Sequence, residues 1–138
     1  MAPVTINYLS IFVAAVAQMA LGMFWYSPAG FGKPWMSLMG LSPDQMAGKK
    51  EGMGKKYALN ALGALVMAYV LAHFIFYVGA TTLTGGLQAG FWLWLGFVAT
   101  VSLGGVLWEN KPWKLYALNT GFQLAGLLLM GGILAVWK

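Results

Sequence analysis

The amino-acid sequence predicts an all-α membrane protein with four transmembrane helices. Hydrophobic residues make up 60% of the chain and charged residues only 8%, whereas soluble domains carry roughly 25% charged residues. A soluble chain of 138 residues could not bury so much apolar surface. In addition, four apolar runs are each long enough to cross a bilayer as a helix. These runs are continuous rather than alternating, which favours helices over the strands of a β-barrel.

We expect residues 1–138 to form a single transmembrane domain. The four predicted spans cover about residues 6–26, 57–79, 88–108 and 115–137. No basic residue precedes the first run, and this run is longer than the apolar core of a signal peptide, so we interpret it as a retained helix. The connections after the second and third spans are short and leave little room for a separate soluble domain.

The first loop, residues 27–56, is expected to contain helical segments of its own. The string PWMSLMG at 34–40 predicts a short interfacial helix. Further on, Ser42 followed by Pro43 and Gln45 has the pattern of a capping box, with proline at the first helical position. We therefore expect an amphipathic cytoplasmic segment that runs from Ser42 into the second span.

The distribution of lysine predicts the orientation of the chain. Of eight lysines, five lie in the loop 27–56, and Lys111 and Lys114 lie between the third and fourth spans. The positive-inside rule places this side in the cytoplasm and both termini outside. Because the lysines flank apolar spans, we expect the partner to be the bilayer, with its anionic headgroups, rather than nucleic acid.

Two pairs of similar strings predict an internal repeat. YALN occurs at 57–60 and 116–119, and KPW occurs at 33–35 and 111–113. Each YALN opens a span, and each KPW follows one. The chain is therefore expected to contain two parallel helix hairpins, related by an axis along the membrane normal.

The longer strings WYSPAGFGKPW (25–35) and WENKPW (108–113) are either ligand-binding loops or places where a span meets water. Trp, Tyr and Lys are typical of membrane interfaces, proline ends a helix, and glycine permits a bend. We favour the second interpretation. The expected interface anchors are Trp25, Tyr26, Ser27, Pro28, Gly32, Lys33, Trp35, Trp108, Lys111 and Trp113.

Polar side chains inside the spans are candidate functional residues, because such groups are costly in lipid. Tyr69, His73 and Tyr77 recur at every fourth position of the second span. His73 is either a ligand or proton site facing an outward cavity, or a hydrogen-bonded core or interface residue. A second group is expected nearer the cytoplasmic side, as a polar vestibule or a lock between helices. Its members are Gln18, Asn60, Glu109, Asn119 and Gln123.

The sequence argues against several kinds of chemistry. It contains no cysteine and a single histidine, so thiolate sites are excluded and a metal centre is not expected. Nucleotide-binding and hydrolase motifs are absent. We expect no enzyme activity and no cofactor. Three classes remain: a homo-oligomeric transporter or channel for a small solute or ion, a structural or accessory protein, and a lipid- or small-ligand-binding protein. The last would use an outer aromatic pocket around Tyr69, His73, Trp92 and Trp94.

Several strings together resemble a known family. They are INYL, WYSPAGFGKPW, AYVLAHF, GFWLWLGFVATVSLGGVLWENKPWKLY and LLLMGGILAVW. They are similar to the prokaryotic membrane proteins known as domain of unknown function 1761, over residues 6–137. The resemblance implies a small multi-span protein of a prokaryotic cytoplasmic membrane, whose activity is unassigned. It transfers no catalytic residue, and it highlights His73 together with the Trp25–Trp35 and Trp108–Trp113 strings.

Overall fold

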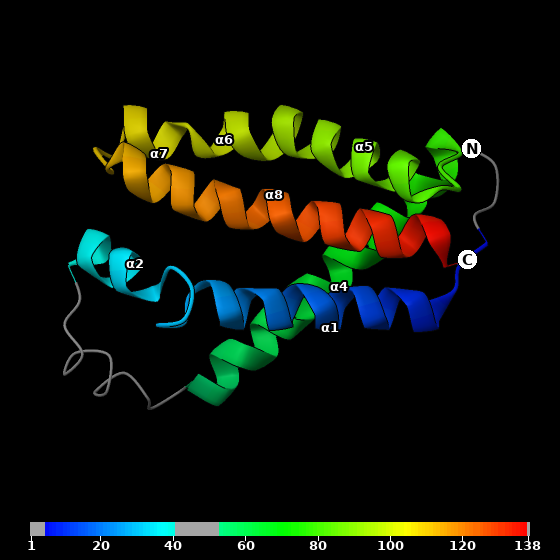
Figure 1. The fold of residues 1–138 in the computed structure, drawn as a ribbon, viewed down its shortest axis with the longest axis horizontal. Helices are drawn as coiled ribbons and strands as arrows, with labels where there is room; N and C mark the ends of the chain where they lie inside the picture. The colour runs from blue at the N-terminus through cyan, green and yellow to red at the C-terminus, as the bar shows by residue number, and fades with distance from the viewer. Residues whose placement is uncertain (1–4, 41–52, 138) are drawn as a thin grey trace.

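The computed structural model describes residues 5–40 and 53–137, and this part of the chain consists of helices joined by short connections (Figure 1). Four helical segments are long and apolar enough to cross a membrane, which confirms the predicted fold class. They are α1 (Tyr8–Trp25), α4 (Met53–Val78), a segmented third span (Leu83–Leu107) and α8 (Trp113–Val136). A short helix, α2 (Gly32–Met39), follows α1.

The second and third spans begin earlier than the sequence suggested. Helix α4 begins at Met53 rather than near residue 57, so its first turn carries lysines. The third span begins at Leu83 rather than near residue 88, because Thr82 caps it. The Thr82 hydroxyl oxygen accepts a hydrogen bond from the Gly85 backbone N–H at 3.1 Å, which satisfies one of the free donors of the first turn.

The first loop confirms one of its two expected helices. Helix α2 covers most of the segment predicted as helical at 34–40 and ends at Met39; it is capped by Gly40, whose φ of 70° is left-handed. The amphipathic helix expected from Ser42 lies outside the described residues. Between α1 and α2 the backbone folds tightly over itself. A Cβ at Gly30 would lie 2.4 Å from the Phe24 carbonyl oxygen, and one at Gly32 would lie 2.6 Å from the Ser27 carbonyl oxygen, so this turn requires glycine at both positions.

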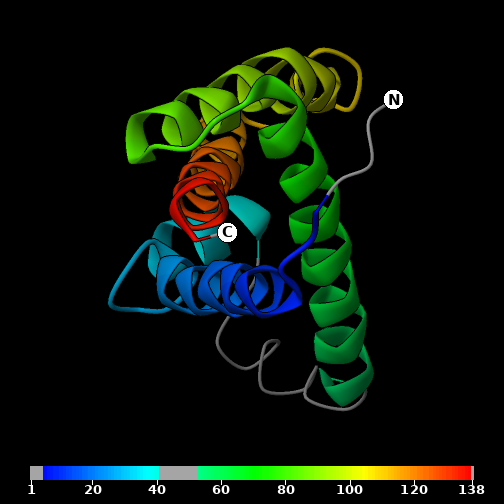
Figure 2. The same cartoon turned by 90° about the vertical axis from the view of Figure 1, so that its right-hand side faces the viewer.

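Helix α8 lies at the centre of the bundle. It packs against α1, α4 and the third span, as Figure 2 shows in a view along the bundle. We call the end where α1 begins and α8 ends the terminal end. The opposite end, where α2 lies and the third span turns into α8, is the loop end (Figure 1). Helix α4 crosses the others obliquely, and its first turns, Gly54 to Asn60, are exposed.

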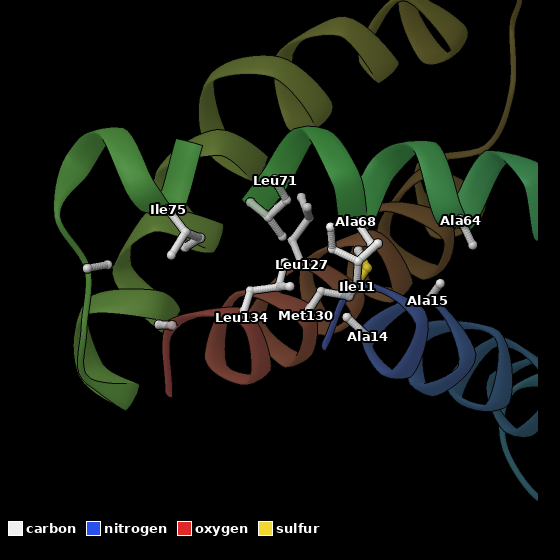
Figure 3. Close-up of a cluster of buried hydrophobic side chains, with 12 residues drawn as sticks. Ile11, Ala14, Ala15, Ala64, Ala68, Leu71, Ile75, Leu127, Met130 and Leu134 are labelled. Atoms are coloured by element: carbon white, nitrogen blue, oxygen red, sulfur yellow. The ribbon is translucent and has the colours of Figure 1, made fainter. Parts of the chain in front are cut away.

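The core forms where α1, α4 and α8 meet (Figure 3). Alanine supplies much of it: Ala14 on α1 and Ala68 on α4 are fully buried. Small side chains let helix backbones approach closely. Larger side chains, of which Ile75 and Met130 are the most buried, fill the remaining space toward the terminal end. The core therefore holds the terminal half of the bundle together more firmly than the loop half.

Glycine brings the third span into backbone contact with α8. A Cβ at Gly86 would lie 2.2 Å from the Gly131 carbonyl oxygen, and one at Gly90 would lie 2.5 Å from the Leu127 carbonyl oxygen. Both glycines belong to α5 (Leu83–Leu93), the first segment of the third span. We call this contact the glycine zipper. It joins the two helices in the terminal half of the bundle only.

Past the zipper, the third span is irregular. A π-helical segment, η1 (Trp94–Ala99), leads into the short helices α6 (Thr100–Ser102) and α7 (Gly104–Leu107). Helices α6 and α7 contact α8 only sparsely, in contrast to α5. Insertion of a π-turn rotates and displaces the following residues, and such turns are frequent at functional sites. The irregularity begins where the third span and α8 lose close contact.

Candidate functional site

A polar cavity of about 350 Å³ lies between α6 and α7 on one side and the first half of α8 on the other. We call it the wedge cavity; it lies in the half of the bundle where the glycine zipper does not join the third span to α8. The third span contributes Val101, Ser102, Gly105 and Val106, and the turn before α8 contributes Glu109 and Lys111. Helix α8 contributes Leu115, Tyr116, Asn119, Thr120 and Gln123. The four α8 residues from Tyr116 to Gln123 recur at helical spacing and form its floor.

Two aromatic side chains brace the cavity at the π-helix. The Trp94 indole N–H donates to the Thr120 carbonyl oxygen at 2.8 Å, and the Tyr116 hydroxyl donates to the Ala99 carbonyl oxygen at 2.6 Å. Each bond joins η1 to α8, one in each direction. A π-turn leaves backbone carbonyls without their usual helical partner, and in an apolar medium such groups need another donor. Trp94 and Tyr116 therefore fix how far the third span stands from α8.

A second pair of aromatic side chains holds the floor from the opposite side. The Tyr26 hydroxyl donates to Asn119 Oδ1 at 2.8 Å, and the Trp25 indole N–H donates to the Leu118 carbonyl oxygen at 3.2 Å. Tyr26 also packs edge-on against Phe122, with ring centroids 5.4 Å apart. Burial raises the pKa of Tyr26 above its ordinary value, so its hydroxyl stays protonated and able to donate.

The bond from Tyr26 orients the Asn119 amide. Because Oδ1 accepts from Tyr26, the Nδ2 group keeps two donors for the wedge cavity. Within the described residues, the amide of Gln123 and the hydroxyl of Ser102 have no hydrogen-bond partner either. The Thr120 hydroxyl donates to the Tyr116 carbonyl oxygen at 2.6 Å. Both α8 and the third span therefore present to the cavity hydrogen-bonding groups that have no partner among the described residues.

An ion pair lies at the mouth of the wedge cavity. Lys111 Nζ is 3.1 Å from Glu109 Oε2, with both side chains more than half exposed. The turn that carries them is pinned, since the Lys111 backbone N–H donates to the Gly105 carbonyl oxygen at 3.0 Å. Asn110, between them, has a left-handed φ of 58°, a conformation that asparagine tolerates better than most residues.

Two further cavities lie between the wedge cavity and the terminal end. An apolar cavity of about 350 Å³ lies between α4 and η1, and it shares Gln123 with the wedge cavity. A cavity of about 450 Å³ at the terminal end, beside Thr82 and Gln88, shares Phe74 and Leu93 with the apolar one. The three cavities therefore form a series from the loop end to the terminal end. The apolar cavity is lined by Met67, Val70, Leu71, Phe74, Leu93, Phe97, Val98, Gln123 and Leu127.

The structure brings together only part of the predicted polar group. Glu109, Asn119 and Gln123 all line the wedge cavity. Asn60 does not join them, because it lies on the exposed first turns of α4. Gln18 is buried elsewhere, where its side chain packs on Gly126 of α8. The YALN repeat predicts equivalent positions for Asn60 and Asn119. In the structure, Asn119 lines the wedge cavity and Asn60 lies outside it.

The tyrosine and histidine stripe lies away from the three cavities. His73 Nδ1 is 2.8 Å from the Tyr69 carbonyl oxygen of the preceding turn, and its ring packs between those of Tyr69 and Tyr77. Neither Trp92 nor Trp94 joins the stripe in an aromatic pocket. Trp92 lines the cavity at the terminal end, and Trp94 braces the wedge cavity.

The anchor residues divide into two groups. Trp108 and Trp113 are exposed, as are Pro28, Lys33 and Lys111, in keeping with interface positions. The first string instead packs inward: Trp25 and Tyr26 bond to α8, and Trp35 packs edge-on against Tyr26. Ser27 donates to the Phe24 carbonyl oxygen at 2.6 Å, and Gly32 is buried in the turn.

Sequence reasoning missed Ser102 and Tyr116 as site residues, and it assigned Trp94 to an outer aromatic pocket rather than to the wedge cavity. Tyr116 stands in the second YALN string, but no local pattern near Ser102 or Trp94 marks the π-turn. Within the part of the chain that the structure describes, no group of three metal-ligating side chains is present.

A family model described as "Protein of unknown function (DUF1761)" matches residues 9–135. No curated protein and no solved structure matches the chain.

Proposed function

The chain belongs to the DUF1761 family of proteins of unknown function, and we propose that it is a membrane protein that binds an amphipathic, lipid-like ligand. One observation carries the proposal: the polar wedge cavity and the apolar cavity share Gln123. Because they meet at this residue, we treat them as one groove, which is polar at the loop end and apolar in the middle. A lipid-like molecule matches this arrangement, with its polar head in the wedge cavity and its acyl chain in the apolar cavity.

The walls of the groove support this assignment. The apolar cavity presents almost no polar surface and is walled by side chains such as Phe74 and Phe97, so a polar solute would lose its hydration there without replacement. An acyl chain carries no such cost. The wedge cavity, in contrast, offers the Asn119 and Gln123 amides, whose hydrogen bonds are costly to leave unmade in an apolar setting.

The lysines suggest where the head group lies. Lys33, Lys55, Lys56, Lys111 and Lys114 are all exposed at the loop end. By the positive-inside rule this end would face the cytoplasm. The wedge cavity would then open at the level of the cytoplasmic headgroups, and the acyl chain would extend toward the terminal end along α4.

A comparison of two amide variants tests the proposal. The protein is purified in mild detergent, and lipid that stays bound is measured by native mass spectrometry. Gln123→Leu removes the amide at the junction of the two cavities, and we expect it to lower retained lipid about tenfold, as the loss of a buried hydrogen bond of about 1.4 kcal/mol would. Asn60→Leu, which removes an amide from outside the cavities, should leave retention unchanged. Equal retention by both variants would contradict the proposal.

The position of the acyl chain gives an independent readout. A phospholipid that carries a diazirine in its acyl chain should label Met67 and Phe97, which line the apolar cavity, in preference to Val16. Val16 is also exposed, but it lies on α1 away from the groove. Uniform labelling of these three positions would indicate ordinary contact with bulk lipid rather than a defined site.

Transport is a second candidate, favoured by the series of three cavities. Because the third cavity shares Phe74 and Leu93 with the apolar one, a ligand could pass from one end of the groove to the other. In proteoliposomes, movement of a labelled lipid or solute should then be blocked by Phe74→Trp, which narrows the shared point. If a broad panel of lipids and solutes crossed the proteoliposomes only at the background rate, both in the unaltered protein and in Phe74→Trp, the transport proposal would be refuted and the binding proposal retained.

A further inference from the structure

We propose that the head group of the ligand is zwitterionic, with a phosphate that pairs with Lys111 and a primary ammonium that pairs with Glu109. This inference rests on the proposed function and adds the chemical class of the ligand. The occupant we assign is therefore a phospholipid of the phosphoethanolamine type, bound with its head in the wedge cavity.

Charge at the cavity mouth is the first argument. Glu109 and Lys111 are the two charged residues that line the wedge cavity, so the site has no net charge. A purely anionic head group that reached Lys111 would be repelled by the nearby Glu109 carboxylate. A purely cationic head group that reached Glu109 would be repelled by the nearby Lys111 ammonium. Only a ligand with both charges can pair with both residues at once. Its binding would break the ion pair between Glu109 and Lys111, and this costs little because exposed ion pairs contribute little stability.

The position of the two side chains is the second argument. A Cβ at Gly105 would lie 3.5 Å from Lys111 Cδ and 3.8 Å from Glu109 Oε2. Both side chains therefore lie back over Gly105, which is itself part of the cavity wall, although more than half of each remains exposed. The left-handed Asn110 and the backbone bond from Lys111 to Gly105 fix this turn. The opposite charges are thus presented side by side at the entrance.

The neutral groups deeper in the cavity fit the phosphate. The Asn119 Nδ2 group and the Ser102 hydroxyl can both donate to phosphate oxygens. The carboxylate of Glu109, in turn, accepts hydrogen bonds only. A primary ammonium supplies three donors to it, whereas a quaternary ammonium supplies none. The site should therefore distinguish phosphatidylethanolamine from phosphatidylcholine, although both lipids are zwitterionic.

Lipid competition on the intact protein tests the assignment. Binding of phosphatidylethanolamine, phosphatidylcholine and phosphatidylglycerol is measured by native mass spectrometry from mixed micelles of known composition. We expect phosphatidylethanolamine to bind about threefold more tightly than the other two, in the range of exposed charge pairs. Glu109→Gln should abolish this preference and favour phosphatidylglycerol. Lys111→Gln should weaken phosphatidylethanolamine and phosphatidylglycerol alike, whereas Lys114→Gln, outside the cavity, should change neither.

The outcomes separate the two proposals. If all three lipids bound equally and Gln123→Leu still abolished binding, the proposal of a zwitterionic head group would be refuted and the proposal of lipid binding would stand. Absence of saturable binding of any lipid would overturn both. Water-soluble glycerophosphoethanolamine, which has the same head without acyl chains, should not compete at concentrations at which the lipid does. Effective competition would show a head-group site for a soluble ligand and refute the assignment of a lipid.

Discussion

Substitution of Gly86 by alanine tests whether the glycine zipper holds the third span against α8. The new Cβ would lie 2.2 Å from the Gly131 carbonyl oxygen and 2.7 Å from Ala135 Cβ, whereas ordinary van der Waals contact begins at 3.4 Å. The closest atom belongs to the backbone and cannot rotate away. The two helices must therefore separate by about 1 Å, which forfeits dispersion contacts along the whole of α5.

The expected cost follows from the behaviour of overpacked cores. Forcing one extra methyl group into a close-packed contact typically costs about 1–3 kcal/mol, and the backbone clash places Gly86→Ala toward the upper end. Gly96→Ala is the matched control, because it lies in the same span and its Cβ would meet nothing within 4 Å. That change should stay within about 0.5 kcal/mol of the unaltered protein.

Reversible unfolding in mixed micelles provides the assay. Tryptophan fluorescence follows the denaturant titration, because Trp94 donates to the Thr120 carbonyl oxygen of α8 and loses that contact on unfolding. The midpoint should fall for Gly86→Ala and not for Gly96→Ala. If the two variants unfolded at the same midpoint, the reasoning from backbone contact would be refuted, and the third span would be held by its side chains instead.

Two smaller changes probe the braces of the cavity. Tyr26→Phe should destabilise the protein by about 0.5–1.5 kcal/mol, the net value of one hydrogen bond. Burial raises the pKa of Tyr26 above 10.0, so its contribution is complete below about pH 10 and is lost as the pH rises through the raised pKa; the variant, followed in the same titration, should lack this alkaline decline. Trp94→Phe removes the donor to Thr120, and bound lipid in native mass spectra should fall while thermal stability changes by only about 1 kcal/mol. A loss of stability without any change in lipid would assign Trp94 to folding alone.

The transmembrane architecture could be predicted because lipid imposes simple rules. Span length and continuous hydrophobicity sufficed to find four helices within a few residues. The start of the third span was missed because LTGGLQAG contains three glycines, which reduce helix propensity in water. In the bundle, these positions are helical because Gly86 and Gly90 allow backbone contact with α8, so tertiary packing overrides local preference.

The candidate site was predictable only in part. Asn119 and Gln123 were found because amides within an apolar span are conspicuous, and Glu109 because it ends a span. Asn60 was grouped with them by the YALN repeat, but the obliquely placed α4 carries it away from the cavity. No local pattern could reveal that two tyrosines and two tryptophans make hydrogen bonds to distant elements. The bond from Tyr26 to Asn119, for example, joins residues 93 positions apart.

This long-range bond explains why the Trp25–Trp35 string needs more than interfacial residues. A membrane anchor requires only amphipathic aromatic and basic side chains, and the exposed Trp108 meets that requirement. Trp25 and Tyr26 instead bond to α8 at consecutive residues, Leu118 and Asn119, and the tight turn that follows needs glycine at fixed positions. The string therefore sets the orientation of the Asn119 amide in the wedge cavity. The turn that the sequence predicts to lie at the boundary between membrane and water therefore also supports the candidate binding site.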